Sequence, residues 1–443
     1  MDKNQMHFEG YPTFRVAACD LNGQMRGKRL PAAQFDKLGE GSVRMPLSVL
    51  NVDIWGADIE GSPLVFETGD ADGILLPTDH GPVPMPWLGS PAALVPMWMY
   101  RDNGEPFDGD PRHALATVVE RYTARGWRIE AAAEMEFYLV DDSGDILTPP
   151  LNPSSGRPLH GQAILSIRQI DAFDAYFTEL YEACEAMEIP AESAISEAGL
   201  GQFEVNLAHR DAMAAADDAF LFKALVRGLA RKHGMAATFM AKPFAEDAGN
   251  GMHVHFSVLD RDGNNIFDNG GSKGTDLLLN AVAGCLACMA PSTLVFAPHG
   301  PSYDRIVPGA HAPFGACWAY ENRTAAIRIP GGPARARRIE HRVSSGDNNP
   351  YLAMAMMLGA AMVGIEDGLT PPAPITGNAY ALNLPGLEPD WASALARFEA
   401  DPLVARILPA GLIRNYCATK RQEMLHLAEV PNDDRWKVYL ESA

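Results

Sequence analysis

The sequence lacks the loops that bind nucleotides or activate a serine by their spacing alone. The nearest approach to the GxxxxGK[ST] phosphate loop is GGSKGT at residues 270–275, and its spacing is wrong. No GxGxxG follows an expected strand, and no GxSxG segment joins an expected strand to a helix as a nucleophile elbow does. These absences exclude the common P-loop, dinucleotide-binding and serine hydrolase sites. If a nucleotide binds, arginines and metal ions must hold its phosphates.

An apolar run long enough to cross a bilayer is also missing. Residues 281–298 are interrupted by Pro291 and polar side chains, and the run at 351–365 has about 15 residues, short of the ~20 that a membrane helix needs. We expect both runs to form buried helices. The N-terminal residues, MDKNQMHFEGYPTFR, contain no apolar signal core, so we expect a cytoplasmic protein without membrane contact.

Cysteine is scarce, and basic residues are in the minority. The six cysteines are scattered along 443 residues, which fits reduced thiols. Cys285 and Cys288 lie in an apolar run without a second pair, where core packing is expected rather than metal binding. The 36 Lys and Arg against 56 Asp and Glu give a formal net charge of −20, which argues against a general affinity for nucleic acid or anionic membranes.

The composition and its change along the chain predict two domains. Hydrophobic residues make up 47% of the sequence, so a substantial core is expected. Residues 1–105 are rich in Gly, Pro and β-formers, with a hairpin turn at Asn22-Gly23 and further β-structure over 48–77, and predict a small β-grasp-like domain. From Asp110-Pro111, a typical helix start, helices alternate with strands. The sequence therefore predicts an α+β fold, in which residues 106–443 form a catalytic domain with an antiparallel sheet and flanking helices.

The segment MHVHFSV at residues 252–258 has the alternation of a strand with one polar face. Since residues i and i+2 of a strand share a face, His253, His255 and Ser257 point one way and the apolar residues between them point the other. Burying two imidazoles and a hydroxyl is costly without partners. A lone His-x-His is more often a surface or hydrogen-bonded pair, so its meaning depends on what the rest of the chain places beside it.

Three other segments place charged side chains with the same alternation or beside a tight turn. These residues are Glu134, Glu136, Glu197, Glu204, Glu340 and Arg342. Five carboxylates and a histidine cannot share a low-dielectric cleft without compensating positive charge. Oxygen ligands with one imidazole suit Mg²⁺ or Mn²⁺ better than zinc, and two or three divalent ions would balance the charge.

Arginines can supply further positive charge where an anionic substrate would bind. They are Arg305, Arg323, Arg328 and Arg342. Their planar groups hold phosphates and carboxylates through paired hydrogen bonds. Carboxylates for metals and arginines for anions, without a Walker loop, suggest metal-assisted phosphoryl transfer to a small carboxylate. A glycosidase, the other use of paired carboxylates, leaves the histidines and arginines unexplained.

The chain resembles the glutamine synthetase family in five motifs that agree in order and spacing: EMEF, SEAGLGQFEVN, AKPFAEDAGNGMHVHFS, NRTAAIRIP and ARRIEHR. Four further segments resemble the γ-glutamylpolyamine (γ-glutamylputrescine) synthetase-like branch of this family: DLNGQMRGKRLP, GDADG, GNNIF and RIEHRVSSGDNNPYLAMA. The resemblance implies a glutamine synthetase-type catalytic domain. It also implies a ligase that uses ATP to activate L-glutamate as γ-glutamyl phosphate, which an amine then attacks.

The resemblance implies a role for each matching residue. The metal nearest glutamate would be held by Glu136, Glu197 and Glu204, and the metal that bridges the ATP phosphates by Glu134, His253 and Glu340. Nucleotide-side positions would be His255 and Ser257, glutamate-binding positions Gly249, Arg305 and Arg342, and phosphate-contacting catalytic positions Arg323 and Arg328. In the family these sites lie between subunits of stacked rings, commonly dodecamers, where the N-terminal domain of one subunit closes the site of its neighbour.

Departures from the family concern the acceptor. Six residues after Arg305, where true glutamine synthetases have a glutamate that takes a proton from ammonium, this chain has His311. An imidazole can act as a base but offers ammonium no anionic partner. The loop that usually carries an ammonium-binding aspartate reads LNVDIWGAD, in which Asp53 could substitute. Both changes favour a larger, organic amine.

The identity of the amine stays open. Phe314, Trp318 and Tyr320 could form an apolar wall for it, and a long diamine would need a distal carboxylate that an alkyl or aromatic monoamine would not. Tyr380 lies in an altered adenylylation-type region, so regulation by that route is doubtful. The alternatives are an authentic, ammonia-using glutamine synthetase and a catalytically inactive structural or sensor relative.

Overall fold

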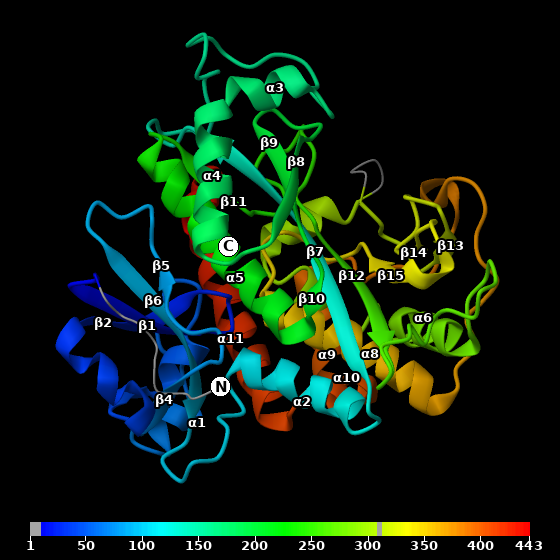
Figure 1. Ribbon diagram of the computed structural model, residues 1–443, viewed down its shortest axis with the longest axis horizontal. Helices are drawn as coiled ribbons and strands as arrows, with labels where there is room; N and C mark the ends of the chain where they lie inside the picture. Colours follow the sequence, from blue (N-terminus) through cyan, green and yellow to red (C-terminus); the bar gives the residue numbers. More distant parts are fainter. Residues whose placement is uncertain (1–9, 308–311) are drawn as a thin grey trace.

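The computed structural model describes residues 10–307 and 312–443 and contains two β-sheets with helices packed around them (Figure 1). The smaller sheet is formed by β1 (Thr13–Cys19), β2 (Met25–Pro31), β3 (Val43–Pro46), β4 (Asp72–Pro77), β5 (Val83–Pro84) and β6 (Ala92–Tyr100). Its order is β2-β1-β6-β4-β3, with β5 on β6, and β1 and β6 are parallel. The predicted hairpin is confirmed, since β1 pairs with β2 and Gly23 in the turn has a φ of 77°.

The prediction of continued β-structure over residues 48–77 is wrong for its first part. This part contains η2 (Leu47–Asn51) and α1 (Pro63–Phe66), and η1 (Ala32–Glu40) precedes it. Pro63 occupies the first position of α1, where proline favours a helical turn because its missing N–H has no helical partner there. Within residues 48–77, all of which the structure describes, the only strand is β4.

The larger sheet carries the polar segments singled out in the sequence. It is formed by β7 (Arg128–Val140), β8 (Ala191–Ser196), β9 (Gln202–Leu207), β10 (Arg210–Asp211), β11 (Ala236–Thr238), β12 (Met252–Leu259), β13 (Trp318–Tyr320), β14 (Ile327–Ile329) and β15 (Ile339–His341). Its order is β13-β14-β15-β12-β7-β9-β8, with β10 and β11 pairing with β7. The predicted antiparallel arrangement holds except for β13 and β14, which are parallel.

Helices lie before, between and after the strands of the large sheet along the chain. They are α2 (Pro111–Thr123), α3 (Ile167–Ala172), α4 (Asp174–Ala186), α5 (Ala212–Lys232), α6 (Asp276–Ala287), α7 (Thr293–Phe296), α8 (Pro350–Asp367), α9 (Trp391–Ala400), α10 (Pro402–Ile407), α11 (Ala410–Glu429) and α12 (Arg435–Tyr439), with η3 (Gly300–Arg305), η4 (Ala334–Ala336), η5 (Ala379–Ala381) and η6 (Asn432–Asp434). Apolar residues of β7 and β12 share one core with α5 and α8. Among the described residues, every helix is too short or too polar to cross a membrane.

The expected single helix over residues 281–298 is wrong in its extent. Helix α6 ends at Ala287, a turn follows, and the chain re-enters a helix only at α7. Pro291 lies in this turn, and proline cannot continue a helix because it lacks the N–H donor. Both halves are buried, as predicted.

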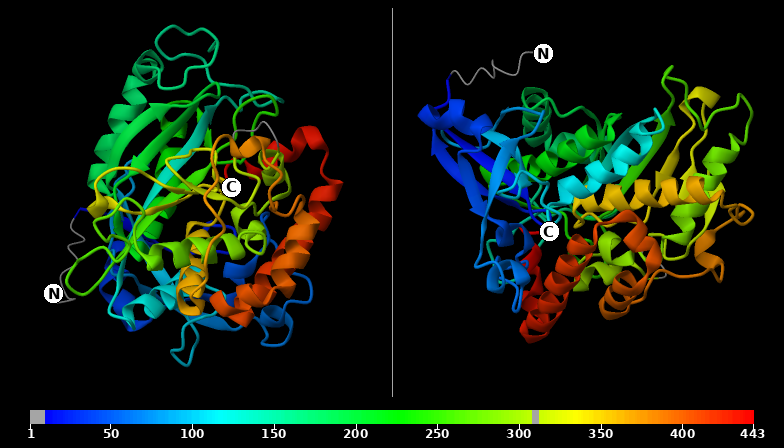
Figure 2. Two further views of the ribbon diagram at one scale, coloured as in Figure 1. Left: turned by 90° about the vertical axis from the view of Figure 1, so that its right-hand side faces the viewer. Right: turned by 90° about the horizontal axis from the view of Figure 1, so that it is seen from below.

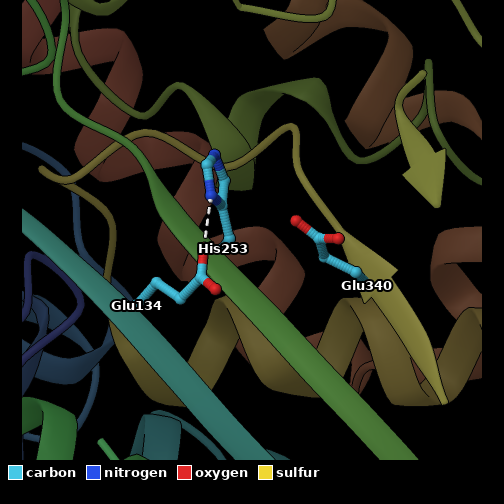
Figure 3. A group of neighbouring side chains, drawn as sticks. All are labelled: Glu134, His253 and Glu340. Atoms are coloured by element: carbon cyan, nitrogen blue, oxygen red, sulfur yellow. Dashed lines mark hydrogen bonds and ion pairs between the residues drawn. The ribbon is translucent and has the colours of Figure 1, made fainter. Parts of the chain in front are cut away.

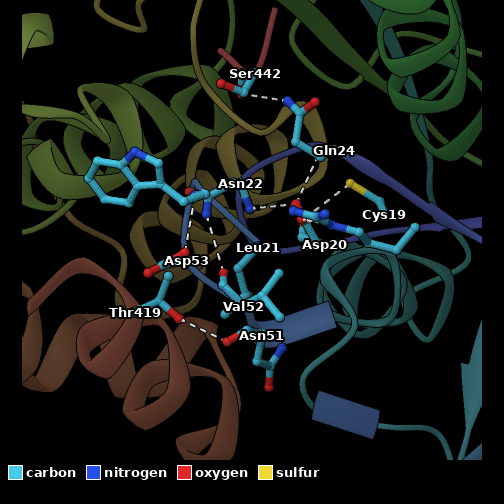
Figure 4. Close-up of polar contacts among 12 residues, drawn as sticks. Cys19, Asp20, Leu21, Asn22, Gln24, Asn51, Val52, Asp53, Thr419 and Ser442 are labelled. Atoms are coloured by element: carbon cyan, nitrogen blue, oxygen red, sulfur yellow. Dashed lines mark hydrogen bonds and ion pairs between the residues drawn. The ribbon is translucent and has the colours of Figure 1, made fainter. Parts of the chain in front are cut away.

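Buried polar contacts fasten the N-terminal sheet to α11. Nδ2 of Asn22 donates to Oε1 of Glu423 at 2.7 Å, and Oγ1 of Thr419 donates to the carbonyl oxygen of Asn51 at 3.3 Å (Figure 4). The N-terminal sheet is thereby held at one end of the molecule, whereas β13 to β15 lie toward the other end (Figures 1 and 2). The domain boundary near residue 105 falls between the two sheets and stays a prediction.

Close packing of α6 against α8 generates a test of the core. A Cβ added at Gly284 would lie 2.1 Å from the carbonyl oxygen of Ala360, and one added at Gly364 would lie 2.1 Å from that of Asn280. Gly284→Ala should therefore lower the free energy of unfolding by roughly 1–3 kcal/mol, measured as a lower denaturant midpoint. Gly89→Ala is the control, because its Cβ would meet nothing within 4 Å. An unchanged midpoint for Gly284→Ala would contradict this packing.

Candidate active site

The polar residues of β7 and β12 meet at the centre of the large sheet. In the antiparallel register His253 lies opposite Glu134, and Met252 and Val254 are buried on the other side of β12. Nδ1 of His253 lies 2.9 Å from Oε2 of Glu134, and Nε2 of His255 lies 2.9 Å from Oε1 of the same carboxylate. Glu134 therefore provides the partner that both imidazoles need on this face.

The row of polar side chains continues onto the neighbouring strands. Glu136 of β7 lies opposite Glu204 of β9. On the other side, Glu340 of β15 lies opposite both His255 of β12 and Arg328 of β14. Antiparallel pairing therefore brings together, in one row across five strands, side chains that are far apart in the sequence. We call this set, with Glu134 and His253, the polar row.

Two groups within the polar row have ligand atoms close enough to share a metal ion. The ligand atoms lie within 4.8 Å of one another in each group, which are Glu134, His253 and Glu340 (Figure 3) and Glu136, Glu204 and His253. The first group is the set that the sequence predicts for the ion at the ATP phosphates. Four carboxylates and one imidazole are the donors that Mg²⁺ and Mn²⁺ prefer, so the residues present fit such ions.

The carboxylates of the row differ in how their charge is balanced. Burial alone would raise the pKa of Glu134, but hydrogen bonds from His253 and His255 outweigh it and hold that pKa below its usual range. Burial, followed by the charge of Glu136, raises the pKa of Glu204 well above its usual range. Burial and Glu136 likewise raise the pKa of Glu197, which directly follows β8, to about 7. The last two carboxylates lack a sufficient positive partner in the chain itself.

Arginines surround Glu340 at the other end of the row. Nη1 of Arg328 donates to Oε2 of Glu340 at 2.8 Å, and Nη1 of Arg342 donates to Oε1. Burial is the largest single influence and raises the pKa of Glu340, but the charges of Arg342, His255 and His253 together outweigh it and lower that pKa. Arg323 is exposed on the loop before β14, and its charge acts on Glu197. The structure thus brings three of the predicted arginines to the carboxylates.

The fourth arginine, Arg305, is buried at the end of η3. Its Nη1 donates to the carbonyl oxygen of Val343 at 2.8 Å. A Cβ added at Gly251 would lie 2.7 Å from Nη2 of Arg305, and one added at Gly249 would lie 3.0 Å from its Cγ. Since any larger residue would displace the guanidinium, these two glycines set the position of Arg305 beside Glu136, whose Oε2 accepts from the Gly251 N–H at 2.6 Å.

Arg338 belongs to the site and was missed in the sequence. Its Nε donates to Nδ1 of His255 at 3.1 Å, on the opposite side of the ring from Glu134. The sequence contained a signal for it, because residues 338, 340 and 342 are two apart and therefore lie on the same face of an extended strand. Ser257, the other predicted nucleotide-side residue, is half-buried on β12 opposite Glu130.

The structure does not place Asp53 in the polar row. Its Oδ1 accepts from the backbone N–H groups of Trp55 and Ala57 at 3.0 and 2.9 Å, and its Oδ2 accepts from Nε2 of Gln422 at 2.8 Å. It is fully buried in these contacts. His311 lies outside the described residues. The amine-binding role of Asp53 and the catalytic role of His311 stay predictions.

Of the three aromatic residues expected at the amine, Trp318 and Tyr320 lie edge to face with ring centroids 5.3 Å apart, whereas Phe314 has a different aromatic partner. Nε1 of Trp318 donates to the carbonyl oxygen of Pro372 at 2.7 Å, and the hydroxyl of Tyr320 donates to that of Lys273 at 2.9 Å. Phe314 instead stacks against Tyr380, which was not predicted as its partner.

Comparison with known proteins identifies the family. The family model described as glutamine synthetase, catalytic domain, matches residues 108–439. The chain belongs to the glutamine synthetase family. The family and the glutamine synthetase-type α+β fold predicted from the sequence are therefore confirmed, as is the prediction of a carbon–nitrogen ligase. Members of this family use ATP and divalent metal ions.

Relatives of this glutamine synthetase family member include ligases that are named for organic amines. Gamma-glutamylputrescine synthetase PuuA of Escherichia coli (strain K12) is 34% identical over 99% of this chain and 94% of that protein. Glutamate–isopropylamine ligase of a Pseudomonas species is 31% identical over 93% and 91%. A solved structure titled as a GmaS/ADP complex aligns with a TM-score of 0.83 and 26% identity, over 97% of this chain and 96% of that one.

Removal of divalent ions should make folding stability depend on pH. The pKa values of Glu197 and Glu204 are raised above the ordinary 4.5, so the metal-free folded chain keeps protons that the unfolded chain loses. This contribution to stability is present below pH 4.5 and is lost as pH rises through the raised pKa values. Melting of EDTA-treated protein should therefore show a stabilisation by added Mn²⁺ that grows from about pH 6 to about pH 8.5, by at most about 1.4 kcal/mol per pH unit for each displaced proton.

The matched variants are Glu204→Gln and Glu185→Gln. Glu204→Gln removes one titrating carboxylate and should reduce both the Mn²⁺ effect and its pH dependence, whereas Glu185 is exposed on α4 and its variant should behave as the unmodified protein. A stabilisation by Mn²⁺ that is equal at every pH would contradict the assignment of Glu197 and Glu204 as metal ligands.

Proposed function

We propose that this chain is an ATP-dependent ligase that activates L-glutamate as γ-glutamyl phosphate and joins it to an organic amine. The observation that carries the proposal is the polar row, which combines two groups of divalent-metal ligands with arginines at one end. The family membership and the relatives that act on organic amines support it. We infer two or three Mg²⁺ or Mn²⁺ ions in each site.

The reaction would proceed in two displacements. A γ-carboxylate oxygen of glutamate attacks the γ-phosphorus of ATP, and ADP leaves. The amine nitrogen then attacks the γ-carbonyl carbon, phosphate leaves and the amine loses a proton. Divalent ions held by Glu134, His253 and Glu340, and by Glu136, Glu204 and Glu197, would neutralise the phosphates and the developing charge.

The arginines would hold the two anionic substrates. We assign Arg305 and Arg342 to glutamate and Arg323 and Arg328 to the transferred phosphoryl group. Arg305 suits this role because Gly249 and Gly251 give it a fixed position beside Glu136. A preorganised guanidinium stabilises a transition state without the cost of reorganisation at the moment of reaction. His255, held between Glu134 and Arg338, and Ser257 are assigned to the nucleotide side.

Two other functions are less well supported, namely an ammonia-using glutamine synthetase and an inactive relative. Ammonium as acceptor is favoured by relatives such as the glutamine synthetase of Thermus thermophilus, 31% identical over 94% of this chain and 92% of that protein. Against it, His311 stands where that reaction needs a glutamate. An inactive structural or sensor relative would be expected to lose metal ligands or arginines, and this chain keeps them.

We also propose a cytoplasmic ring assembly, commonly a dodecamer in this family, with sites between subunits. The N-terminal sheet is fastened to α11 at the end of the molecule away from β13 to β15 (Figures 1 and 2). It is therefore the N-terminal sheet of a neighbour that we expect to close the polar row of this chain.

A steady-state screen tests the acceptor. With ATP, L-glutamate and Mg²⁺, phosphate release should depend on an organic amine, with kcat/KM at least ~10-fold above the value for ammonium. Putrescine, spermidine, ethanolamine and an aromatic monoamine are compared with ammonium, and Glu340→Gln should abolish turnover. Preference for ammonium would make this an authentic glutamine synthetase. No release with any amine, despite bound ATP and metal, would favour the inactive relative.

The residue at position 311 should control the choice between ammonium and an organic amine. His311→Glu supplies an anionic partner for ammonium and should raise kcat/KM for ammonium by roughly tenfold, relative to that for the preferred amine. His160→Glu adds the same charge at an exposed position and should leave the ratio unchanged. An unaltered ratio in His311→Glu would argue against this role of the loop.

A further inference from the structure

Phe314 and Tyr380 form a stacked aromatic pair that the sequence did not predict. Their ring centroids are 6.1 Å apart and their planes differ by 22°. Both side chains are half-buried. Phe314 precedes β13 and Tyr380 lies in η5, so tertiary structure alone brings the rings together.

Hydrogen bonds place the pair beside the loop before β14 that carries Arg323. Backbone bonds of 2.7 and 3.1 Å join residues 314–316 to 385–387. Oγ1 of Thr324 accepts from the N–H of Ala379 at 2.9 Å, which ties η5 to the residue next to Arg323. The two segments of the pair are therefore bonded to each other and are tied to the candidate active site through Thr324.

Contacts place Tyr380 near Arg342, because Ala379 packs with Ala325 and the carbonyl oxygen of Ala326 accepts from the Arg342 N–H at 3.0 Å. Burial raises the pKa of its hydroxyl, and the charges of Arg342 and Arg305 oppose this increase. These are the arginines assigned to glutamate. An acceptor that attacks the γ-carbonyl of glutamate must approach from this neighbourhood.

The two segments that carry the pair are apolar and contain no carboxylate. Ala379, next to Tyr380, belongs to a small core with Cys317, Ala319 and Ala325, against which Ile375 and Leu384 pack. Residues 312–320 and 371–387 contain no Asp or Glu. A hydrocarbon chain or ring would bury apolar area here, whereas a second ammonium group would lose water without gaining an anionic partner.

We propose that Phe314 and Tyr380 form the wall against which the acceptor amine packs, and that the acceptor is a monoamine with an alkyl or aryl body. This inference rests on the proposed ligase function. It replaces Trp318 and Tyr320 as wall residues, since both are engaged with the backbone of other loops. Aromatic rings suit this task because their faces contact C–H groups. They also tolerate the one positive charge that a monoamine carries before it loses its proton.

The test compares large and small acceptors in four variants, at saturating ATP and L-glutamate. Phe314→Ala and Tyr380→Ala remove the rings, and Phe314→Leu and Tyr380→Phe keep apolar bulk or the ring. We expect KM for butylamine and benzylamine to rise roughly tenfold in the alanine variants. KM for hydroxylamine, which is too small to reach the wall, should stay unchanged, and Tyr380→Phe should behave as the unmodified enzyme. Phe66→Ala, at an exposed ring of α1, is the matched control.

Each other outcome overturns a defined part of the inference. Equal changes in KM for hydroxylamine and butylamine would show a structural role, and no change for either would remove the pair from the acceptor site. A preference of the unmodified enzyme for putrescine over butylamine would overturn the monoamine class. Absence of product with every acceptor, hydroxylamine included, would overturn the proposed ligase function itself and this inference with it.

Discussion

Repulsion between carboxylates is the constraint on which the large sheet depends. Antiparallel pairing sets Glu134, Glu136, Glu204 and Glu340 in one row on a single face. Where a positive partner is near, as at Glu134 and Glu340, the pKa is lowered despite burial. Where none suffices, as at Glu204, the pKa is raised. The chain thus leaves a deficit of positive charge, and this deficit is the physical basis for the proposed divalent ions.

The rest of the large sheet holds the row in place against that repulsion. The apolar residues between the charged ones pack on α5 and α8 in one continuous core. Glycines allow close approach where a side chain would intrude, between α6 and α8 and between Gly251 and Arg305. Side chains on such rigid strands keep their geometry better than side chains on loops do. The metal ligands are accordingly assigned to strands and their ends, and the acceptor function to the loops around Phe314 and Tyr380.

The separation of the two sheets bears on how the site would be completed. Asp53, the N-terminal residue predicted to meet the amine, is buried between its own loop and α11. Its carboxylate serves to hold that loop, and within one chain the loop is fastened away from the polar row. If a neighbouring subunit closes the site, residues of its N-terminal sheet would meet the acceptor. The family includes relatives named glutamine synthetase and one named glutamate–isopropylamine ligase, so differences in these loops are where acceptor choice would be made.

The sequence alone determined the family, the polar faces of β7 and β12 and the start of α2, because alternation, helix caps and motif order are local properties of the chain. It also placed most of the metal-ligand and arginine candidates. Only the tertiary structure decided which carboxylate lies opposite which imidazole, that Arg338 supports His255, and that Phe314 stacks on Tyr380 rather than joining Trp318 and Tyr320. Strand register and loop pairing are set by contacts between residues far apart in sequence, and no local pattern encodes them.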